Sequence, residues 1–129
     1  MDKLQISDVV LYLPQNTNVL FKRHWGDYET LELNGFTLLN WMMLKNISMK
    51  LILYPLSAIT DEDMKRMSNR LEYKMTFDGE LFQIDDSKLS VNEIPYLCWE
   101  YLVEKGFDVK EFIERGLAVE NKEERVFQN

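Results

Sequence analysis

The chain has 129 residues, of which 46% are hydrophobic, 12% aromatic and 29% charged, a composition typical of one globular domain and not of a disordered chain. Its net charge is −7, no apolar run approaches the ~20 residues that cross a bilayer, and the start lacks the pattern of a signal peptide. We therefore expect a cytoplasmic protein that makes no contact with a membrane.

The charges are unevenly distributed. Residues 1–59 hold five acids and five bases, whereas residues 60–129 hold the other 17 acids and 10 bases. A chain without a broad basic face gains little from counterion release, so nucleic acid is not an expected partner. Cys98 is the only cysteine, which excludes an internal disulfide and agrees with a cytoplasmic setting.

The first half of the chain is predicted to be mainly β. A short helix is expected from Ser7 to Pro14, where the proline stops it. Gly26-Asp27 and Asn34-Gly35 are typical of two-residue hairpin turns, and they predict an antiparallel meander whose fourth strand is 49–54. Because apolar residues occur on both faces, we expect the meander to curl into a partial barrel.

Two tight turns would align the aromatic side chains in one row. In that register Tyr28 faces Trp25 on one side and Trp41 on the other, and Arg23 lies beside them. These four residues are the candidate partner-binding site. The row could instead be core beneath the helices, or, with Lys22, a platform for single-stranded nucleic acid.

The second half begins with a helix and a hairpin. Thr60 is a good helix cap, and acids follow it in the first turn. The stripe of Met64, Met67 and Leu71 predicts the buried face. Asp78-Gly79 then predicts a hairpin between 73–77 and 80–84. In this hairpin Met75 would pair with Phe82, and Tyr73 with Ile84.

Two helices are predicted in the last third. The first has an apolar stripe (Ile94, Leu97, Cys98, Tyr101 and Leu102) and ends at Gly106. The second is capped by Asp108 and ends at Gly116, so that the two form an αα-hairpin. The expected fold is α+β in a single domain, 1–129: mainly β over 1–59, then helix, hairpin and helices over 60–119, and a frayed tail over 120–129.

The search for reactive groups finds no catalytic, cofactor-binding or metal-binding site. His24 lies across from Glu29 in the expected register, which indicates a polar cross-strand pair rather than a catalytic base. Cys98 lies on an apolar stripe, where a thiol is buried and inert. Three acids (Asp61, Asp63 and Glu72) match positions of a calcium loop. The ligand and the turn glycine that such a loop needs are replaced by Lys65 and Arg66, so the acids belong to a helix start.

Three segments resemble a group of short uncharacterised proteins from Bacteroides-type genomes and their phage or mobile-element regions. They are Asp8 to Pro14, Met49 to Thr60, which contains Pro-Leu-Ser-x-x-Thr, and Phe107 to Ala118, which contains Phe-Asp-Val and Gly-Leu-Ala. The resemblance implies a bacterial or phage cytoplasmic setting. It implies no activity and no functional residues.

Together these observations predict a non-enzymatic protein-interaction module, of phage origin by resemblance, without cofactor or metal. The expected partner is another protein, and a homo-oligomer stays open. One alternative is an acidic inhibitor that mimics nucleic acid and blocks a host enzyme, for which the acids of 60–129 would share one face. The other is a module that binds single-stranded nucleic acid through Lys22, Arg23 and Trp25.

Overall fold

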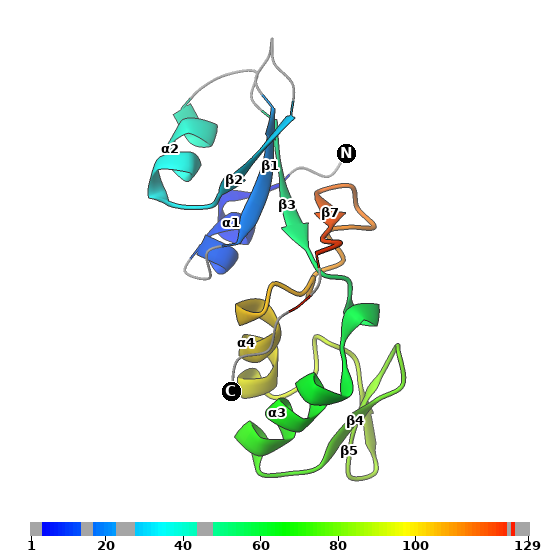
Figure 1. The fold of residues 1–129 in the computed structure, drawn as a ribbon. Coiled ribbons are helices and arrows are strands. Elements are labelled where there is room, and N and C mark those ends of the chain that lie inside the picture. Colours follow the sequence, from blue (N-terminus) through cyan, green and yellow to red (C-terminus); the bar gives the residue numbers. More distant parts are fainter. Residues whose placement is uncertain (1–3, 14–16, 23–27, 44–47, 124, 126–129) are drawn as a thin grey trace.

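A computed structural model describes residues 4–13, 17–22, 28–43, 48–123 and 125 (Figure 1). These residues form the α+β fold that the sequence predicts, with N-terminal antiparallel strands and a later hairpin. The helices are α1 (Ile6–Tyr12), α2 (Gly35–Met43), η2 (Leu56–Ala58, a 3-10 turn), α3 (Asp61–Leu71) and α4 (Tyr96–Glu104). The strands are β1 (Asn18–Lys22), β2 (Tyr28–Glu32), β3 (Ser48–Leu53), β4 (Met75–Phe77), β5 (Phe82–Ile84), β6 (Ser87–Leu89) and β7 (Ala118–Glu120).

The N-terminal sheet has the strand order β2-β1-β3-β7. Strand β1 pairs antiparallel with both β2 and β3, and β7 adds to β3 in parallel. The pairing aligns Val19, Leu51 and Ala118 in one row, and all three are buried. Tyr12 of α1 belongs to the same core, so one face of this sheet supports the interior of the protein.

The segment 35–43 is a helix, and the expected third strand of the meander is wrong. The side-chain oxygen Oδ1 of Asn34 accepts from the backbone nitrogen of Thr37 at 2.9 Å. Asparagine favours hairpin turns and helix caps alike, and here it caps. Trp41 therefore lies on a helix, so no cross-strand row links it to Tyr28.

The register between β1 and β2 also differs from the expected one. Lys22 pairs with Tyr28, and Phe21 pairs with Glu29. The expected register is three residues away, and an odd shift moves every side chain to the other face. Phe21 is accordingly buried while Tyr28 is exposed, and the residue that Glu29 faces is Phe21. His24, Arg23 and Trp25 lie outside the described residues.

The second sheet confirms the predicted hairpin but shifts its register by two residues. Met75 pairs with Ile84 and Phe77 with Phe82, and β6 extends the hairpin to three strands. The cause is a wider turn, because Oδ1 of Asp78 accepts from the backbone nitrogens of Glu80 and Leu81 at 2.9 and 2.8 Å. An even shift preserves the faces, so Met75 and Phe82 are buried as expected.

Helix α4 follows part of the predicted stripe, and Ile94 is buried but precedes the helix. Cys98, Tyr101 and Leu102 are buried, whereas Leu97 is 46% exposed. Gly106 (φ +79°) ends the segment in a left-handed conformation, as a C-terminal glycine commonly does.

The expected second helix of an αα-hairpin is wrong, because residues 107–116 form turns. The carboxylate of Asp108 accepts from the backbone nitrogens of Phe112 and Ile113, each at 2.9 Å, and of Lys110 at 3.3 Å. A carboxylate that binds several backbone N–H groups competes with helical hydrogen bonding. Glu111 in addition adopts φ +58°, which interrupts a helix.

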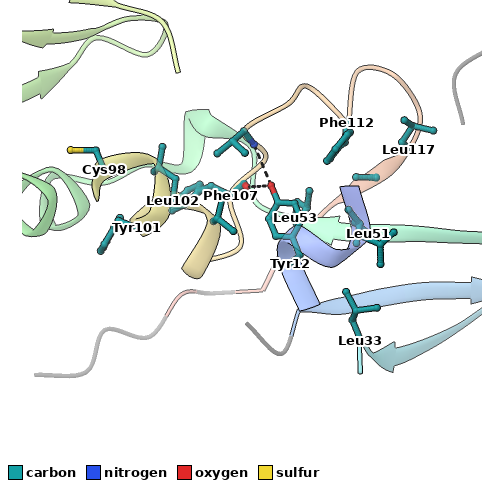
Figure 2. Close-up of a cluster of buried hydrophobic side chains, with 14 of the residues drawn as sticks. Tyr12, Leu33, Leu51, Leu53, Cys98, Tyr101, Leu102, Phe107, Phe112 and Leu117 are labelled. Carbon is teal, nitrogen blue, oxygen red and sulfur yellow. Dashed lines mark hydrogen bonds between the residues drawn. The ribbon is translucent and has the colours of Figure 1, made fainter. Parts of the chain in front are cut away.

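This turn segment joins the two halves of the molecule (Figure 2). The hydroxyl of Tyr12 donates to the carbonyl of Phe107 at 2.6 Å, and the two residues are 95 positions apart. The backbone of Tyr54 forms hydrogen bonds with the residues before and after Phe107. Its nitrogen donates to the carbonyl of Gly106, and its carbonyl accepts from the backbone nitrogen of Asp108, each at 2.8 Å. The core is thus continuous from α1 to α4.

Two of the described residues beyond β7, Asn121 and Arg125, contact the core, whereas residues 124 and 126–129 of the tail that was expected to fray, 120–129, lie outside the described residues. Glu120 itself is the last residue of β7. The backbone nitrogen of Asn121 donates to the carbonyl of Leu53 at 2.7 Å, and Arg125 forms an ion pair with Asp63 of α3.

Candidate functional site

Helix α2 is unusual because it is apolar and exposes most of its apolar side chains on one side. It carries no charged residue, and Thr37 is its only buried residue. Phe36, Leu39 and Met43 are 76%, 52% and 71% exposed, and their spacing places them on one stripe. A helix that is apolar around most of its circumference is normally covered. In Figure 1 α2 lies at the outer side of the sheet, next to β2.

The opposite side of α2 attaches it to the protein. The Oγ1 of Thr37 donates to the carbonyl of Glu32 at 2.9 Å. Leu38 and Trp41 are half-buried and pack against the hydrophobic core. Trp41, one of the four predicted site residues, thus contributes to packing, and the exposed stripe belongs to its neighbours on the helix.

Tyr28 is the predicted site residue that is most open to solvent among those described. It is 51% exposed on β2, and the ammonium of Lys22 lies 5.0 Å from its ring centroid. Among the described residues β2 pairs only with β1, so it forms an edge of the sheet. The structure therefore places Tyr28 and Trp41 on consecutive elements, not in one row, and does not describe Arg23 or Trp25.

The chemistry that this surface offers is apolar contact. Asn40 is the polar residue on the outer half of α2, and its side-chain nitrogen donates within the helix, to the carbonyl of Phe36 at 3.1 Å. Burial of apolar area contributes roughly 25 cal/mol per Å², so apolar burial is the interaction that this stripe can offer a partner. The spacing of Phe36, Leu39 and Met43 is the sequence signal for this stripe, and it is hidden when 35–43 is expected to be a strand.

A second cluster, which sequence reasoning missed, is centred on Asp63 in the first turn of α3. The carboxylate is fully buried and accepts from the Tyr101 hydroxyl at 2.7 Å and from the Thr60 backbone nitrogen at 2.8 Å. Arg125 donates to both of its oxygens. The Thr60 cap was predicted, but nothing near Asp63 in the sequence indicates its two distant partners.

The electrostatics of this cluster are those of a paired buried charge. Burial alone raises the pKa of the Asp63 carboxyl, but hydrogen bonds from Arg125, Thr60 and Tyr101 outweigh it, so the pKa lies below its usual value. Burial, followed by the hydrogen bond to Asp63, raises the pKa of Tyr101 to about 12. Burial alone lowers the pKa of Arg125, but Asp63 outweighs it and holds the guanidinium charged.

The reactive candidates that the structure describes occupy structural positions, and His24 lies outside the described residues. Cys98 is buried with its sulfur 3.6 Å from that of Met75, and burial raises the pKa of its thiol. Asp61 and Asp63 lie in the first turn of α3, as predicted for a helix start, and Glu72 follows the helix at φ +62°. Within the described ranges no three acidic, histidine or cysteine side chains converge as metal ligands, and no helix has the length and apolar character to cross a bilayer.

The chain was compared with family models, curated proteins and solved structures. No family model matches the chain, and no curated protein or solved structure matches it.

Proposed function

We propose that this protein is a non-enzymatic protein-interaction module that docks through the exposed stripe of α2, and that it docks on the same stripe of a second copy. The observation that carries the proposal is an uncharged helix of nine residues of which only one is buried. Exposed apolar patches on a monomer commonly mark protein contacts. The single cysteine and the resemblance to Bacteroides-type and phage-region proteins favour a cytoplasmic setting.

The stripe suits a partner related by twofold symmetry. Phe36, Leu39 and Met43 can pack against their own copies across an antiparallel pair of helices, because such a contact needs a self-complementary surface. The absence of charge on α2 means that no like charges meet at the axis. Seated against a second copy, each helix would cover the apolar side that the monomer leaves in water.

The charge distribution of the whole chain supports this choice of partner. Two copies that meet through α2 bring together their neutral first halves, 1–59, while the acidic second halves, with 17 acids and 10 bases, stay apart. The neighbouring edge strand favours the helix over strand pairing as the contact. Glu29 and Glu32 are exposed on β2, and charged residues on an edge strand disfavour its addition to another sheet.

The expected association is weak. A helix of nine residues is about 13 Å long, which limits the interface to the small end of specific contacts. We expect a dimer with a dissociation constant of about 10 to 100 μM, in the range of small, transient interfaces.

The test is sedimentation equilibrium over a range of protein concentration. The wild-type chain should convert from monomer to dimer, and Leu39→Asp should stay monomeric, because a charge cannot be buried at the centre of the contact without a partner. Leu97→Asp is the matched control, since Leu97 is a leucine of comparable exposure on α4. It should dimerise like the wild type.

Two results would overturn the proposal. One is a wild-type chain that stays monomeric up to about 1 mM, well above the expected constant. The other is equal loss of association in Leu39→Asp and Leu97→Asp, which would place the contact elsewhere. Circular dichroism of each variant checks that a variant which stays monomeric is still folded.

A further inference from the structure

The Asp63 cluster does not depend on α2 or on the association proposed for it. Its carboxylate is oriented by groups other than Arg125. Oδ2 accepts from the backbone nitrogen of Thr60 at 2.8 Å and from its Oγ1 at 3.0 Å, and Oδ1 accepts from the Tyr101 hydroxyl at 2.7 Å. Helices α3 and α4 therefore hold a buried anion in a fixed plane, whether or not a cation is present.

Arg125 fills the space in front of this anion as a ligand would. Its two terminal nitrogens donate to the two oxygens of Asp63, one of them at 2.7 Å to Oδ1. The guanidinium carbon lies 4.5 Å from the ring centroid of Phe107 and 5.6 Å from that of Tyr54. A two-pronged carboxylate contact combined with aromatic faces is the set of interactions that selects arginine over lysine.

The residues that contact the guanidinium of Arg125 lie in a different part of the chain from Arg125 itself. The contacting residues all lie in the range 54–107, whereas Arg125 follows β7. The Arg125 side chain is only 12% exposed, so its removal would leave a buried carboxylate without a counter-charge. A guanidinium group from outside could then restore both the ion pair and the aromatic contacts.

We propose that the pocket formed by Asp63, Tyr101, Phe107 and Tyr54 is a binding site for the arginine side chain of a polypeptide, which Arg125 occupies in cis. The internal arginine acts as a tethered competitor. A tethered group has an effective concentration of about millimolar, so a partner's arginine gains access when the segment that carries Arg125 is displaced. The contact of Arg125 is therefore autoinhibitory.

The test uses the full chain with Arg125→Ala and two blocked amino acids as probes, Nα-acetyl-arginine amide and Nα-acetyl-lysine amide, at equal ionic strength. Binding is followed by amide chemical shifts near Asp63 and Phe107. The arginine probe should bind the variant saturably, and the lysine probe at least about tenfold more weakly, because it lacks the planar fork. The wild-type chain should bind the arginine probe at least about tenfold more weakly than the variant, because Arg125 competes.

Two further variants connect the binding to the pocket. Adding Asp63→Asn to Arg125→Ala should abolish the preference for arginine, and adding Phe107→Leu instead should weaken arginine binding while keeping the acid. Equal binding of both probes by Arg125→Ala, or binding that Asp63→Asn leaves unchanged, would overturn the proposal.

If Arg125→Ala unfolds, the same titration is followed by far-ultraviolet circular dichroism. Refolding by the arginine probe but not by the lysine probe supports the site. Failure of both probes to refold the chain rejects it.

Discussion

Helices α2 and α3 both begin at a side-chain cap, yet they are held in place by different means. Asn34 caps α2 and Thr60 caps α3, each by accepting from a backbone nitrogen three residues on. Helix α3 buries Asp63, Met64 and Met67, whereas α2 buries only Thr37. The comparison shows that a cap determines where a helix starts. Whether the helix is stable within a single chain depends on how much of its apolar side that chain buries.

The largest expected difference between the two helices comes from truncating one apolar side chain on each. Met67→Ala should lower the free energy of unfolding by about 2 to 5 kcal/mol, because Met67 is fully buried. Leu39→Ala should lower it by less than about 0.5 kcal/mol, because Leu39 is half exposed. Urea unfolding at a protein concentration that keeps the chain monomeric measures both. A cost for Leu39→Ala as large as that for Met67→Ala would show that α2 is covered within a single chain.

The caps should have similar and smaller effects, which sharpens the comparison. Asn34→Ala and Thr60→Ala should each lower the free energy of unfolding by about 1 kcal/mol, the usual cost of a lost helix cap. Asn34→Asp and Thr60→Ser are the matched controls, since both keep an oxygen that can accept the hydrogen bond. If Asn34→Ala has no effect, its contact with Thr37 does not hold the start of α2.

The smallest effect is a pH dependence that α3 has and α2 lacks. The pKa of Asp63 is lower in the folded chain than its usual value of 3.8, so the unfolded chain binds more protons as the solution is acidified. The stability that Asp63 contributes is therefore complete above that usual value and is lost as the pH falls through the folded pKa. Helix α2 has no titratable group and contributes nothing to this slope.

The measurement compares wild type with Asp63→Asn by urea unfolding from about pH 5 to about pH 2, a range that begins above the usual pKa of a carboxyl and extends below it. Hydrogen bonds from the backbone also lower the pKa of Asp78 and Glu93, so only the difference between the two chains reports on Asp63. The wild type should lose more stability than the variant on acidification. Parallel curves would mean that the pKa of Asp63 is the same in the folded and unfolded chains.

Local signals predicted some elements correctly, but the cap at Asp108 predicted a helix that residues 107–116 do not form. The cap at Thr60 and the alternation across 73–84 led to α3 and to the second hairpin. Asn34-Gly35 satisfies a hairpin turn and a helix cap equally well, and there the wrong choice replaced α2 by a strand. The two register errors differ in consequence, because the even shift at Asp78 left the buried faces intact and the odd shift at Tyr28 reversed them.

The candidate sites were less accessible to such reasoning. Burial of Cys98 followed from its place on a helical stripe, which is a local pattern. The partners of Asp63 are 38 and 62 positions away, at Tyr101 and Arg125, and no periodicity connects them. The exposure of α2 depends on whether other elements of the fold pack against it. The sequence pattern of one segment carries no information about that packing.

The parallel pairing of β7 with β3 has a consequence for the order of synthesis. Leu51 of β3 can pair with Ala118 of β7 only after Ala118 has been synthesised. A chain grows at about 5 to 20 residues per second. Until then one edge of β3 has no strand beside it in the nascent chain, and an unpaired apolar edge is a template for joining other chains. Between the synthesis of those two residues, this edge of β3 is open to pairing with other chains.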